Sequence, residues 1–419
     1  MAEAVREGQS RDTDIQIDFD AIRKDFPVLN QTVQGHPLVY LDNAASSQMP
    51  RPVIERIDRY HSREHANVHR GIHTLSQKAT DAFEEARDKA QKLINARHRH
   101  EIIYTTGTTD SINLVANSFG RKYFKPGDEI LLSQIEHHSN IVPWQLIAEQ
   151  TGANIRVIPV DDNGDLVWEE YTGALSEKTA LVAIIHVSNA LGTINPVKRI
   201  VAQAHEYDVP VLLDGAQAAP HLDIDVQDID CDFYAFSAHK MCGPTGFGIL
   251  YGKERYLEEM PPYRGGGEMI DKVSFEETTW NRLPHKFEAG TPPIAAAVGY
   301  SAALGYLDEI GMENIAAREK KLLDYATTQV ASLEGLRIIG TAKEKASVLS
   351  FVFEEIHAAD VGAILNQQGI AVRTGHHCAQ PTMRRFEIPA TARASLSFYN
   401  NEEDIDRLVE GLEKVREFF

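Results

Sequence analysis

The feature that most constrains the fold of this chain is an alternation of short apolar runs with longer segments of helical period, from about Val39 to Gly252. Most runs are separated by a helical segment or a turn, and they read LVYL, EIIYT, EILLS, IRVIPV, ALVAIIHVS, PVLLD, DFYAFSA and GFGILYG. Strands that alternate with helices form largely parallel sheets covered by helices on both faces. The sequence therefore predicts an α/β unit here, with its first long helix running from Ser76, as N-cap, to Ile94.

A different pattern follows the glycine and proline clusters in PPYRGGGEM and EAGTPP. Helical segments are predicted at about 294–310 and 314–333, and two more near 359–368 and 402–418. The predicted strands between them read GLRIIG, SVLSFVF, IAVRTG and RASLSF. Strands and helices mixed in this order indicate a smaller α+β domain.

Charge and cysteine content narrow the class of protein. In a chain of 419 residues, 61 acidic residues outnumber 42 basic ones, and the net charge of -19 would repel a polyanion such as nucleic acid. Three cysteines, Cys231, Cys242 and Cys378, are too few for a disulfide framework and suit a reducing cytoplasm. The sequence shows neither a signal-peptide core nor an apolar stretch of about 18 residues, the length that spans a membrane. We therefore predict a cytoplasmic globular protein.

Polar residues follow three of the predicted strands, in TTGTTDSINL, LLDGAQAAP and FSAHKMCGPTG. Ligands of α/β proteins bind beyond the carboxyl ends of strands, where these clusters are expected to converge. Asp214 ends one strand and Lys240 follows another, so each needs a partner of opposite charge. Two interpretations stay open: a direct salt bridge, or a shared ligand. Pyridoxal phosphate suits both residues, because its aldehyde forms a Schiff base with a lysine amine and its ring nitrogen needs an acidic partner.

A phosphate group also needs hydrogen-bond donors. Gly107, Thr108 and Thr109 stand at the start of a predicted helix, where unpaired backbone N–H groups and the helix dipole favour an anion. Ser237 and His239 are candidate side-chain donors to the same phosphate. By itself, Gly-Thr-Thr more often marks a simple helix cap, so its meaning here depends on the neighbouring clusters.

Cys378 lies in the polar segment RTGHHCAQP, where it is a candidate metal ligand or nucleophile, or has no role. Adjacent residues of one short loop rarely supply a tetrahedral zinc site, and the chain has no companion CxxC or HxxxH, so we predict no metal. A free thiol with a pKa of about 8.5 is mostly protonated near neutral pH. Protonated His376 or His377, or Arg373, is expected to raise the thiolate fraction of Cys378.

Five segments together give a resemblance to a known family: SAHKMCGPTGFGILYG, LLDGAQAAPH, QIEHHSNIVPWQ, HVSNALGTINP and RTGHHCAQP. In this order they resemble the group II cysteine desulfurases of the SufS type, in the class V aminotransferase-like branch of fold-type I pyridoxal-phosphate enzymes. The resemblance extends from Asp18 nearly to the C-terminus. Two positions depart from common forms of the motifs, Thr374 where relatives carry a small residue and Arg264 where some carry an acid.

The resemblance implies an α/β fold with two domains. The large domain, residues 36–293, would hold a mostly parallel seven-stranded sheet flanked by helices. The small α+β domain, residues 294–419, would carry the catalytic cysteine. Residues 17–35 are expected to pack on the small domain, and residues 1–16 to form a disordered arm.

Family roles can be carried over residue by residue. The resemblance implies that Lys240 binds the cofactor and moves the substrate's α-proton, that Asp214 holds the pyridine nitrogen, and that Gln217 lies near the ring hydroxyl. His137 would stack on the ring and shuttle a proton, while Asn189 would contact cofactor and substrate. The implied phosphate ligands are Thr108, Thr109, Ser237, His239 and, from a second subunit, Thr291.

A substrate carboxylate calls for the paired N–H donors of arginine. Arg393 is the implied carboxylate ligand; without the family resemblance, a solvated arginine on an edge strand would be preferred. Arg373, His69 and Arg70 are further candidates near the mouth of the site.

The implied reaction is the conversion of L-cysteine to L-alanine, with a persulfide left on Cys378. Its sulfur would pass to an acceptor protein of the SufE or SufU type and serve iron-sulfur cluster assembly, and the enzyme would be a homodimer. The alternatives are a selenocysteine lyase, an aminotransferase, and a non-catalytic scaffold protein that binds pyridoxal phosphate.

Overall fold

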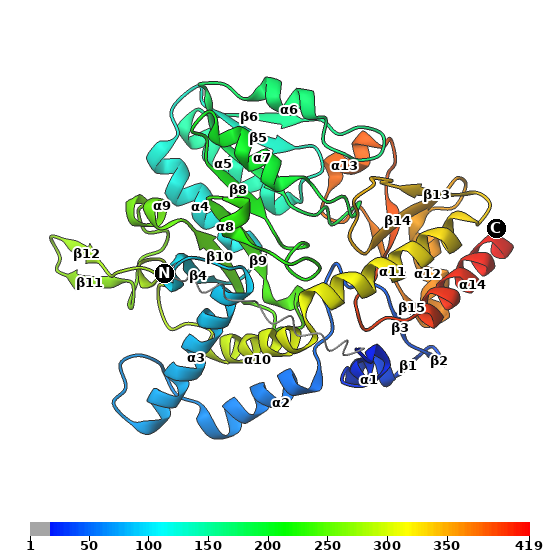
Figure 1. Cartoon of the computed structure of the whole chain (residues 1–419), viewed down its shortest axis with the longest axis horizontal. Helices are drawn as coiled ribbons and strands as arrows, with labels where there is room; N and C mark the ends of the chain where they lie inside the picture. The colour runs from blue at the N-terminus through cyan, green and yellow to red at the C-terminus, as the bar shows by residue number, and fades with distance from the viewer. Residues whose placement is uncertain (1–16) are drawn as a thin grey trace, which may run out of the picture.

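The computed structural model describes residues 17–419, so the predicted arm of residues 1–16 lies outside the described residues (Figure 1). Its centre is a seven-stranded sheet in the order β4-β10-β9-β8-β7-β5-β6. In chain order the strands are β4 (Ile102–Thr105), β5 (Glu129–Ser133), β6 (Asn154–Ile158), β7 (Thr179–Ile185), β8 (Val211–Asp214), β9 (Phe233–Ser237) and β10 (Gly248–Gly252). Seven of the eight apolar runs predicted as strands supply this sheet, which confirms the predicted fold class.

The sheet is parallel except at β10, which runs antiparallel to both β4 and β9. As a result the carboxyl ends of β5, β7, β8 and β9 share one edge of the sheet, and β10 begins at that edge. The pairing of Gly248 with both Thr105 and Ser237 fixes the register there.

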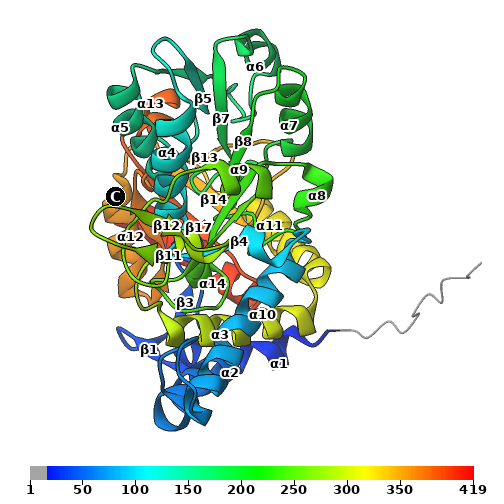
Figure 2. The same cartoon turned by 90° about the vertical axis from the view of Figure 1, so that its left-hand side faces the viewer.

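Helices cover both faces of the sheet, as Figure 2 shows in edge view. One face packs against α3 (Thr74–Leu93), α6 (Trp168–Ala174), α7 (Val197–His205), α8 (Val226–Ile229) and α10 (Ile294–Ile310). The other packs against α4 (Thr108–Tyr123), α5 (Val142–Thr151) and α9 (Glu254–Glu259). Successive strand residues point to opposite faces, so Leu213 belongs to the first core and Leu212 to the second.

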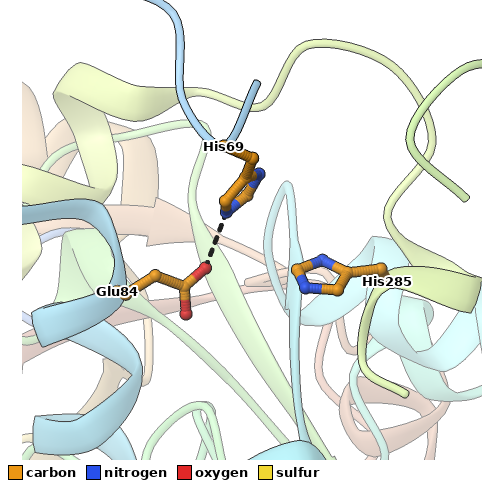
Figure 3. A group of neighbouring side chains, drawn as sticks. All are labelled: His69, Glu84 and His285. Carbon is orange, nitrogen blue, oxygen red and sulfur yellow. Dashed lines mark hydrogen bonds and ion pairs between the residues drawn. The ribbon is translucent and has the colours of Figure 1, made fainter. Parts of the chain in front are cut away.

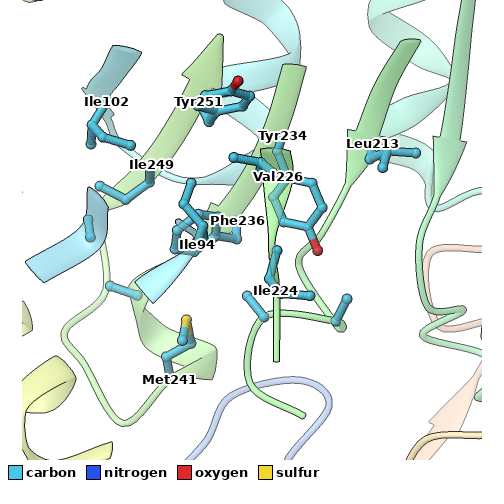
Figure 4. Close-up of a cluster of buried hydrophobic side chains, with 14 of the residues drawn as sticks. Ile94, Ile102, Leu213, Ile224, Val226, Tyr234, Phe236, Met241, Ile249 and Tyr251 are labelled. Carbon is cyan, nitrogen blue, oxygen red and sulfur yellow. The ribbon is translucent and has the colours of Figure 1, made fainter. Parts of the chain in front are cut away.

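The first of these cores is the larger and includes aromatic side chains from the sheet (Figure 4). Tyr234, Phe236 and Ile249 lie on it together with Ile224 and Val226 from the segment after β8. These buried residues keep the neighbouring strand ends in fixed positions, which matters for the side chains that follow β8 and β9.

A second, antiparallel sheet has the order β13-β14-β17-β16. Its strands are β13 (Leu336–Ile339), β14 (Val348–Phe353), β16 (Arg373–Gly375) and β17 (Thr391–Ser395). It shares a core with α11 (Met312–Ala331), α12 (Ala358–Gln367) and α14 (Glu402–Phe418), while the short α13 (Gln380–Arg385) follows β16. We call this group of elements the small unit, and the seven-stranded sheet with its helices the large unit.

The first apolar run of the sequence, LVYL, does not join the large sheet. It forms β3 (Val39–Tyr40), which pairs in parallel with β15 (Ile370–Ala371) beside the small unit. Residues 17–35 contain α1 (Phe19–Arg23), whose Arg23 binds Asp404 of α14 at 2.8 Å. They also contain Phe26, which packs on Tyr399 with ring centroids 4.2 Å apart. The precise domain boundaries stay a prediction.

Further short elements include α2 (Arg51–Arg59), which packs on α10, and two hairpins, β1 (Thr32–Val33) with β2 (His36–Pro37) and β11 (Ile270–Val273) with β12 (Thr278–Trp280). The predicted N-cap Ser76 is wrong: the helix begins two residues earlier, and the side chain of His73 accepts the N–H of Ser76. No helix among residues 17–419 has the length and apolarity needed to cross a membrane.

Candidate active site

A cavity of about 210 Å³ opens where the carboxyl ends of the large sheet face the small unit. Ile185, Asp214 and Ser237, the last residues of β7, β8 and β9, line it from one side. Arg373, Cys378 and Arg393 line it from the small unit. Most of the predicted site residues meet here, from segments as far apart as positions 108 and 393: Thr108, Thr109, His137, Asn189, Asp214, Gln217, Ser237, His239, Lys240, Arg373, Cys378 and Arg393.

Asp214 and Lys240 share the cavity without forming a salt bridge with each other, although both are among the described residues. Asp214 is 2% exposed, and its Oδ1 accepts the backbone N–H of Ala216 at 3.0 Å. Burial lowers the pKa of Lys240 to about 8, against the opposing effect of Asp214. The direct salt bridge considered from the sequence is therefore wrong, and a ligand between the two groups is required to pair them.

A third residue of the same wall supports this conclusion. Gln217 is 1% exposed; its Nε2 donates to the carbonyl of Ala44 at 2.6 Å, but its Oε1 is buried without a hydrogen-bond partner. A buried acceptor of this kind needs a donor from a bound group, such as the ring hydroxyl of pyridoxal phosphate. An amine, a carboxylate and an orphaned acceptor around one cavity fit this cofactor.

His137 caps the short helix η4 (His138–Asn140) at the end of the β5 segment. Its Nδ1 accepts the backbone N–H of Ser139 at 3.0 Å. Burial, reinforced by Lys240, lowers the pKa of His137 to about 3, so the ring is neutral near pH 7. Because Nδ1 is the acceptor, the proton of the neutral ring is on Nε2.

The predicted phosphate cradle is assembled at the N-terminus of α4. Ser237 Oγ accepts the backbone N–H of Thr108 at 2.8 Å and lies 2.8 Å from Thr108 Oγ1. Gly107 has φ 143° and packs directly over β10, where a Cβ on Gly248 would lie 2.5 Å from the Cα of Gly107. The two glycines let the loop sit close to the sheet, so that the positive end of the α4 dipole faces the cavity.

Arg393 is 2% exposed and lies on β17, between β14 and β16, so the alternative of a solvated arginine on an edge strand is wrong. Its Nη1 donates to the carbonyl of Asn189 at 2.8 Å, and its Nη2 donates to Asp42 Oδ1 at 3.1 Å. Asp42 also accepts from Arg373 Nε, at 3.2 Å. One carboxylate therefore orients both arginines of the cavity.

Cys378 is a free, exposed cysteine in the loop between β16 and α13. His377 and Cys378 have φ values of 51° and 54°, a left-handed conformation that costs a non-glycine residue about 1–2 kcal/mol. The carbonyl of His377 accepts from Asn189 Nδ2 at 2.7 Å, and His377 Nε2 lies 2.8 Å from Thr391 Oγ1. These contacts hold His377 buried while the next residue stays exposed.

One part of the thiol hypothesis needs correction. Burial, with a further effect from Arg393, lowers the pKa of His377 to about 3, so this imidazole is neutral near pH 7 and cannot supply a positive charge to the sulfur. Arg373 lines the same cavity as Cys378 and remains available for that role. The proposed effect of positive charge on the thiol stays a prediction.

Three predicted residues do not line this cavity. His69 binds Glu84 at 2.9 Å, and His285 points toward the same carboxylate (Figure 3). Two histidines and a carboxylate could coordinate a metal, but Glu84 also binds Arg87 and Arg99, whose charges would repel a cation. Arg70 pairs with Glu268 at 3.1 Å, and Thr291 lines a separate hollow that Arg264 also borders.

Sequence reasoning missed three residues at the site. Asp42 follows LVYL as Asp214 follows PVLL, and that strand-end pattern could have identified it. Ser139 stands beside His137 in the same motif and lies 2.6 Å from Thr109 through its hydroxyl. His138 contacts the cysteine loop, and only its place next to His137 in the motif could have indicated a role at the site.

Comparison with known proteins places the chain in a family. Residues 39–408 match the aminotransferase class-V family. A probable cysteine desulfurase of Halalkalibacterium halodurans is 52% identical over 398 residues, which is 95% of this chain and 98% of the relative. Three other relatives with cysteine desulfurase names are longer, and the chain spans 60%, 66% and 64% of their lengths.

Comparison with solved structures leads to the same family. The cysteine desulfurase CsdA from Escherichia coli superposes with a TM-score of 0.90 at 37% identity, covering 96% of this chain and 99% of that one. A C-DES variant with glycine covalently linked to its PLP cofactor has a TM-score of 0.81 at 25% identity, covering 93% and 98% of the two chains. The chain belongs to the aminotransferase class-V family of pyridoxal-phosphate proteins, among its cysteine desulfurases.

Proposed function

We propose that this chain is a cysteine desulfurase that uses pyridoxal phosphate to convert L-cysteine to L-alanine and keeps the sulfur as a persulfide on Cys378. The single observation that carries the proposal is the meeting of Lys240 and Cys378 at one cavity, from positions 240 and 378 of the chain. L-Cysteine and one thiol give alanine and one persulfide, so the atoms balance without an external oxidant.

Lys240, Asp214, Gln217, His137 and Asn189 would hold the cofactor ring, and the phosphate would lie at Thr108, Thr109, Ser237 and His239. When bound, pyridoxal phosphate withdraws electrons from the bonds around the α-carbon of the substrate. With its pKa lowered by burial, Lys240 presents a substantial fraction of neutral amine, the form that can bond to an aldehyde and later accept the α-proton at Nζ.

The other side chains would orient the substrate. Arg393 would receive the carboxylate, because its guanidinium is fixed by Asp42 and Asn189 while its Nε has no partner. His137 offers its Nε2 proton from the opposite wall. The Cys378 thiolate would attack the substrate sulfur, forming a sulfur–sulfur bond as the carbon–sulfur bond breaks. Arg373 would help at the mouth of the cavity.

The finer assignments are also proposals. The SufS type and a role in iron-sulfur cluster assembly rest on the resemblance of the motifs, and a cytoplasmic location rests on the low cysteine content. The loop from Gly375 to Pro381 is short, which supports transfer to a dedicated SufE or SufU type acceptor that approaches the exposed thiol. A homodimer is proposed because Thr291, His69 and Arg70 lie away from the cavity of their own chain and would serve that of a second subunit.

The decisive experiment is mass spectrometry of the protein after incubation with L-cysteine. We expect one added sulfur on the peptide containing Cys378 and an equal amount of alanine in solution. Added sulfur on another residue would reject the proposal. So would a sulfur-containing oxo acid and an aminated cofactor in place of alanine, because an aminotransferase exchanges only the amino group of L-cysteine. A Cys378→Ala variant that still releases selenium from selenocysteine would favour the lyase, and a loaded cofactor without any product would favour the scaffold protein.

A further inference from the structure

In the cysteine loop, residues 378–380 are held by different contacts from those that hold His377. His377 is anchored by buried groups, Asn189 and Thr391. In the next three residues, Cys378 and Gln380 are exposed. Within the part of the chain that the structure describes, residues 378–380 make two hydrogen bonds to the large unit, and both are with His138.

His138 makes these two contacts with different groups. Its backbone N–H donates to the carbonyl of Cys378 at 2.7 Å. Its side-chain Nε2 accepts the backbone N–H of Gln380, the first residue of α13, at 3.1 Å. The ring also packs on His376, with centroids 5.6 Å apart. One residue therefore holds the backbone on both sides of the nucleophile.

The imidazole of His138 is suited to this role near neutral pH. Burial and the neighbouring His376 lower its pKa, so the ring is neutral and Nε2 is free to accept a hydrogen bond. The first N–H groups of a helix have no partner inside the helix, and His138 satisfies that of Gln380. In Figures 1 and 2, α13 lies beside the large unit, and its Arg385 donates to the carbonyl of Val160, which follows β6.

We propose that His138 is a positioning residue that sets the distance between the nucleophile of Cys378 and the cofactor ring. It directly follows His137, whose ring lines the cavity, so the N-cap and the first residue of η4 contact the cavity and the cysteine loop, respectively. The loop is in a strained, left-handed conformation at His377 and Cys378, which persists only where contacts hold it. Loss of the His138 contact would let the thiol move away from the cavity.

This inference rests on the proposed function, and the experiment compares side chains at position 138 in the cofactor-loaded protein. His138→Leu removes the acceptor, whereas His138→Gln keeps an acceptor at nearly the position of Nε2. Two rates are measured: single-turnover persulfide formation on Cys378 from L-cysteine, and alkylation of Cys378 by iodoacetamide. The cofactor absorption band is followed after cysteine addition.

We expect His138→Leu to slow persulfide formation about fivefold and to speed alkylation by a similar factor, as expected for the loss of one hydrogen bond. His138→Gln should recover both rates to within about twofold. The matched control is His357→Leu, which removes a similar cap, from Ala359 N–H to His357 Nδ1 at 3.2 Å, on α12 of the small unit. It should change neither rate.

Equal behaviour of the Leu and Gln variants would overturn the inference, and so would an altered cofactor band in the Leu variant. If His138→Leu does not fold, His138→Asn gives the same test, because its amide is polar but one bond too short to reach Gln380. Absence of a persulfide in the unchanged protein would instead refute the proposed function.

Discussion

The two walls of the cavity are built in opposite ways. The large unit presents its groups at the ends of buried parallel strands, where Asp214 and Ser237 are the last residues of β8 and β9. The small unit presents Cys378 on an exposed loop with two consecutive left-handed residues. A cofactor is bound throughout a catalytic cycle, but a persulfide has to leave the cavity. We therefore expect the buried strand ends to hold the cofactor and the exposed loop to carry the sulfur away, which is a prediction for these two sides of the cavity.

The largest effect is expected on the wall formed by the large unit. Lys240→Ala should lower alanine formation by about 10⁴-fold, because no other amine lines the cavity from residues 17–419 to attach the cofactor. Reduction with borohydride followed by peptide mapping checks whether the cofactor is attached at position 240. Lys345→Ala is the matched control, since burial also lowers the pKa of Lys345 to about 8 but its amine binds the carbonyl of Gly340 outside the cavity.

A substitution of Cys378 on the small unit should lower the activity without affecting cofactor binding. Cys378→Ser should lower alanine formation by roughly 10² to 10³-fold, because a hydroxyl cannot accept sulfur, while cofactor absorbance and affinity stay unchanged. Steady-state alanine assays and cofactor titration measure the two properties separately. If this variant also lost cofactor binding, the two sides of the cavity would not have the separate roles expected of them. Cys242→Ser is a control for a cysteine that is buried away from the cavity.

Cofactor uptake should depend on pH through the amine of Lys240. Burial lowers the pKa of Lys240 to about 8 in the cofactor-free chain, and only the neutral amine attacks an aldehyde. The rate of cofactor incorporation should therefore rise nearly tenfold from pH 6 to pH 7 and level off above about pH 9. Stopped-flow absorbance after mixing cofactor-free protein with pyridoxal phosphate measures it. A rate that is flat over this range would show that the amine is not the titrating group.

The smallest effect is expected at the phosphate cradle. Thr108→Val removes a hydroxyl that lies 2.8 Å from Ser237 Oγ, but it leaves the backbone N–H and the helix dipole in place. The dissociation constant of the cofactor should rise only about fivefold, the effect of one hydrogen bond. Equilibrium dialysis measures it, with Thr172→Val on α6, outside the cavity, as a control. An increase above about a hundredfold would mean that the side chain, and not the backbone, binds the phosphate.

The features best predicted from the sequence are those that depend on residues close together along the chain. Short apolar runs between helical segments identified the strands of the large sheet, and polar residues at their ends led to Asp214, Ser237 and Lys240. The sequence could not assign LVYL to β3, because an apolar run does not specify which sheet it joins. Nor could it predict that Asp42 pairs with two arginines, or that His138 contacts the cysteine loop, because these contacts join residues more than 200 positions apart.

The parallel pairing of β3 with β15 has a consequence for how the chain matures. Val39 pairs with Ile370, far along the chain, so the small unit needs both an early and a late segment. During synthesis the seven strands of the large sheet emerge before β15, and N-terminal units generally fold first. We expect a ribosome-bound intermediate with an assembled amine and phosphate cradle but no thiol, which would accept cofactor before it can take sulfur from any substrate.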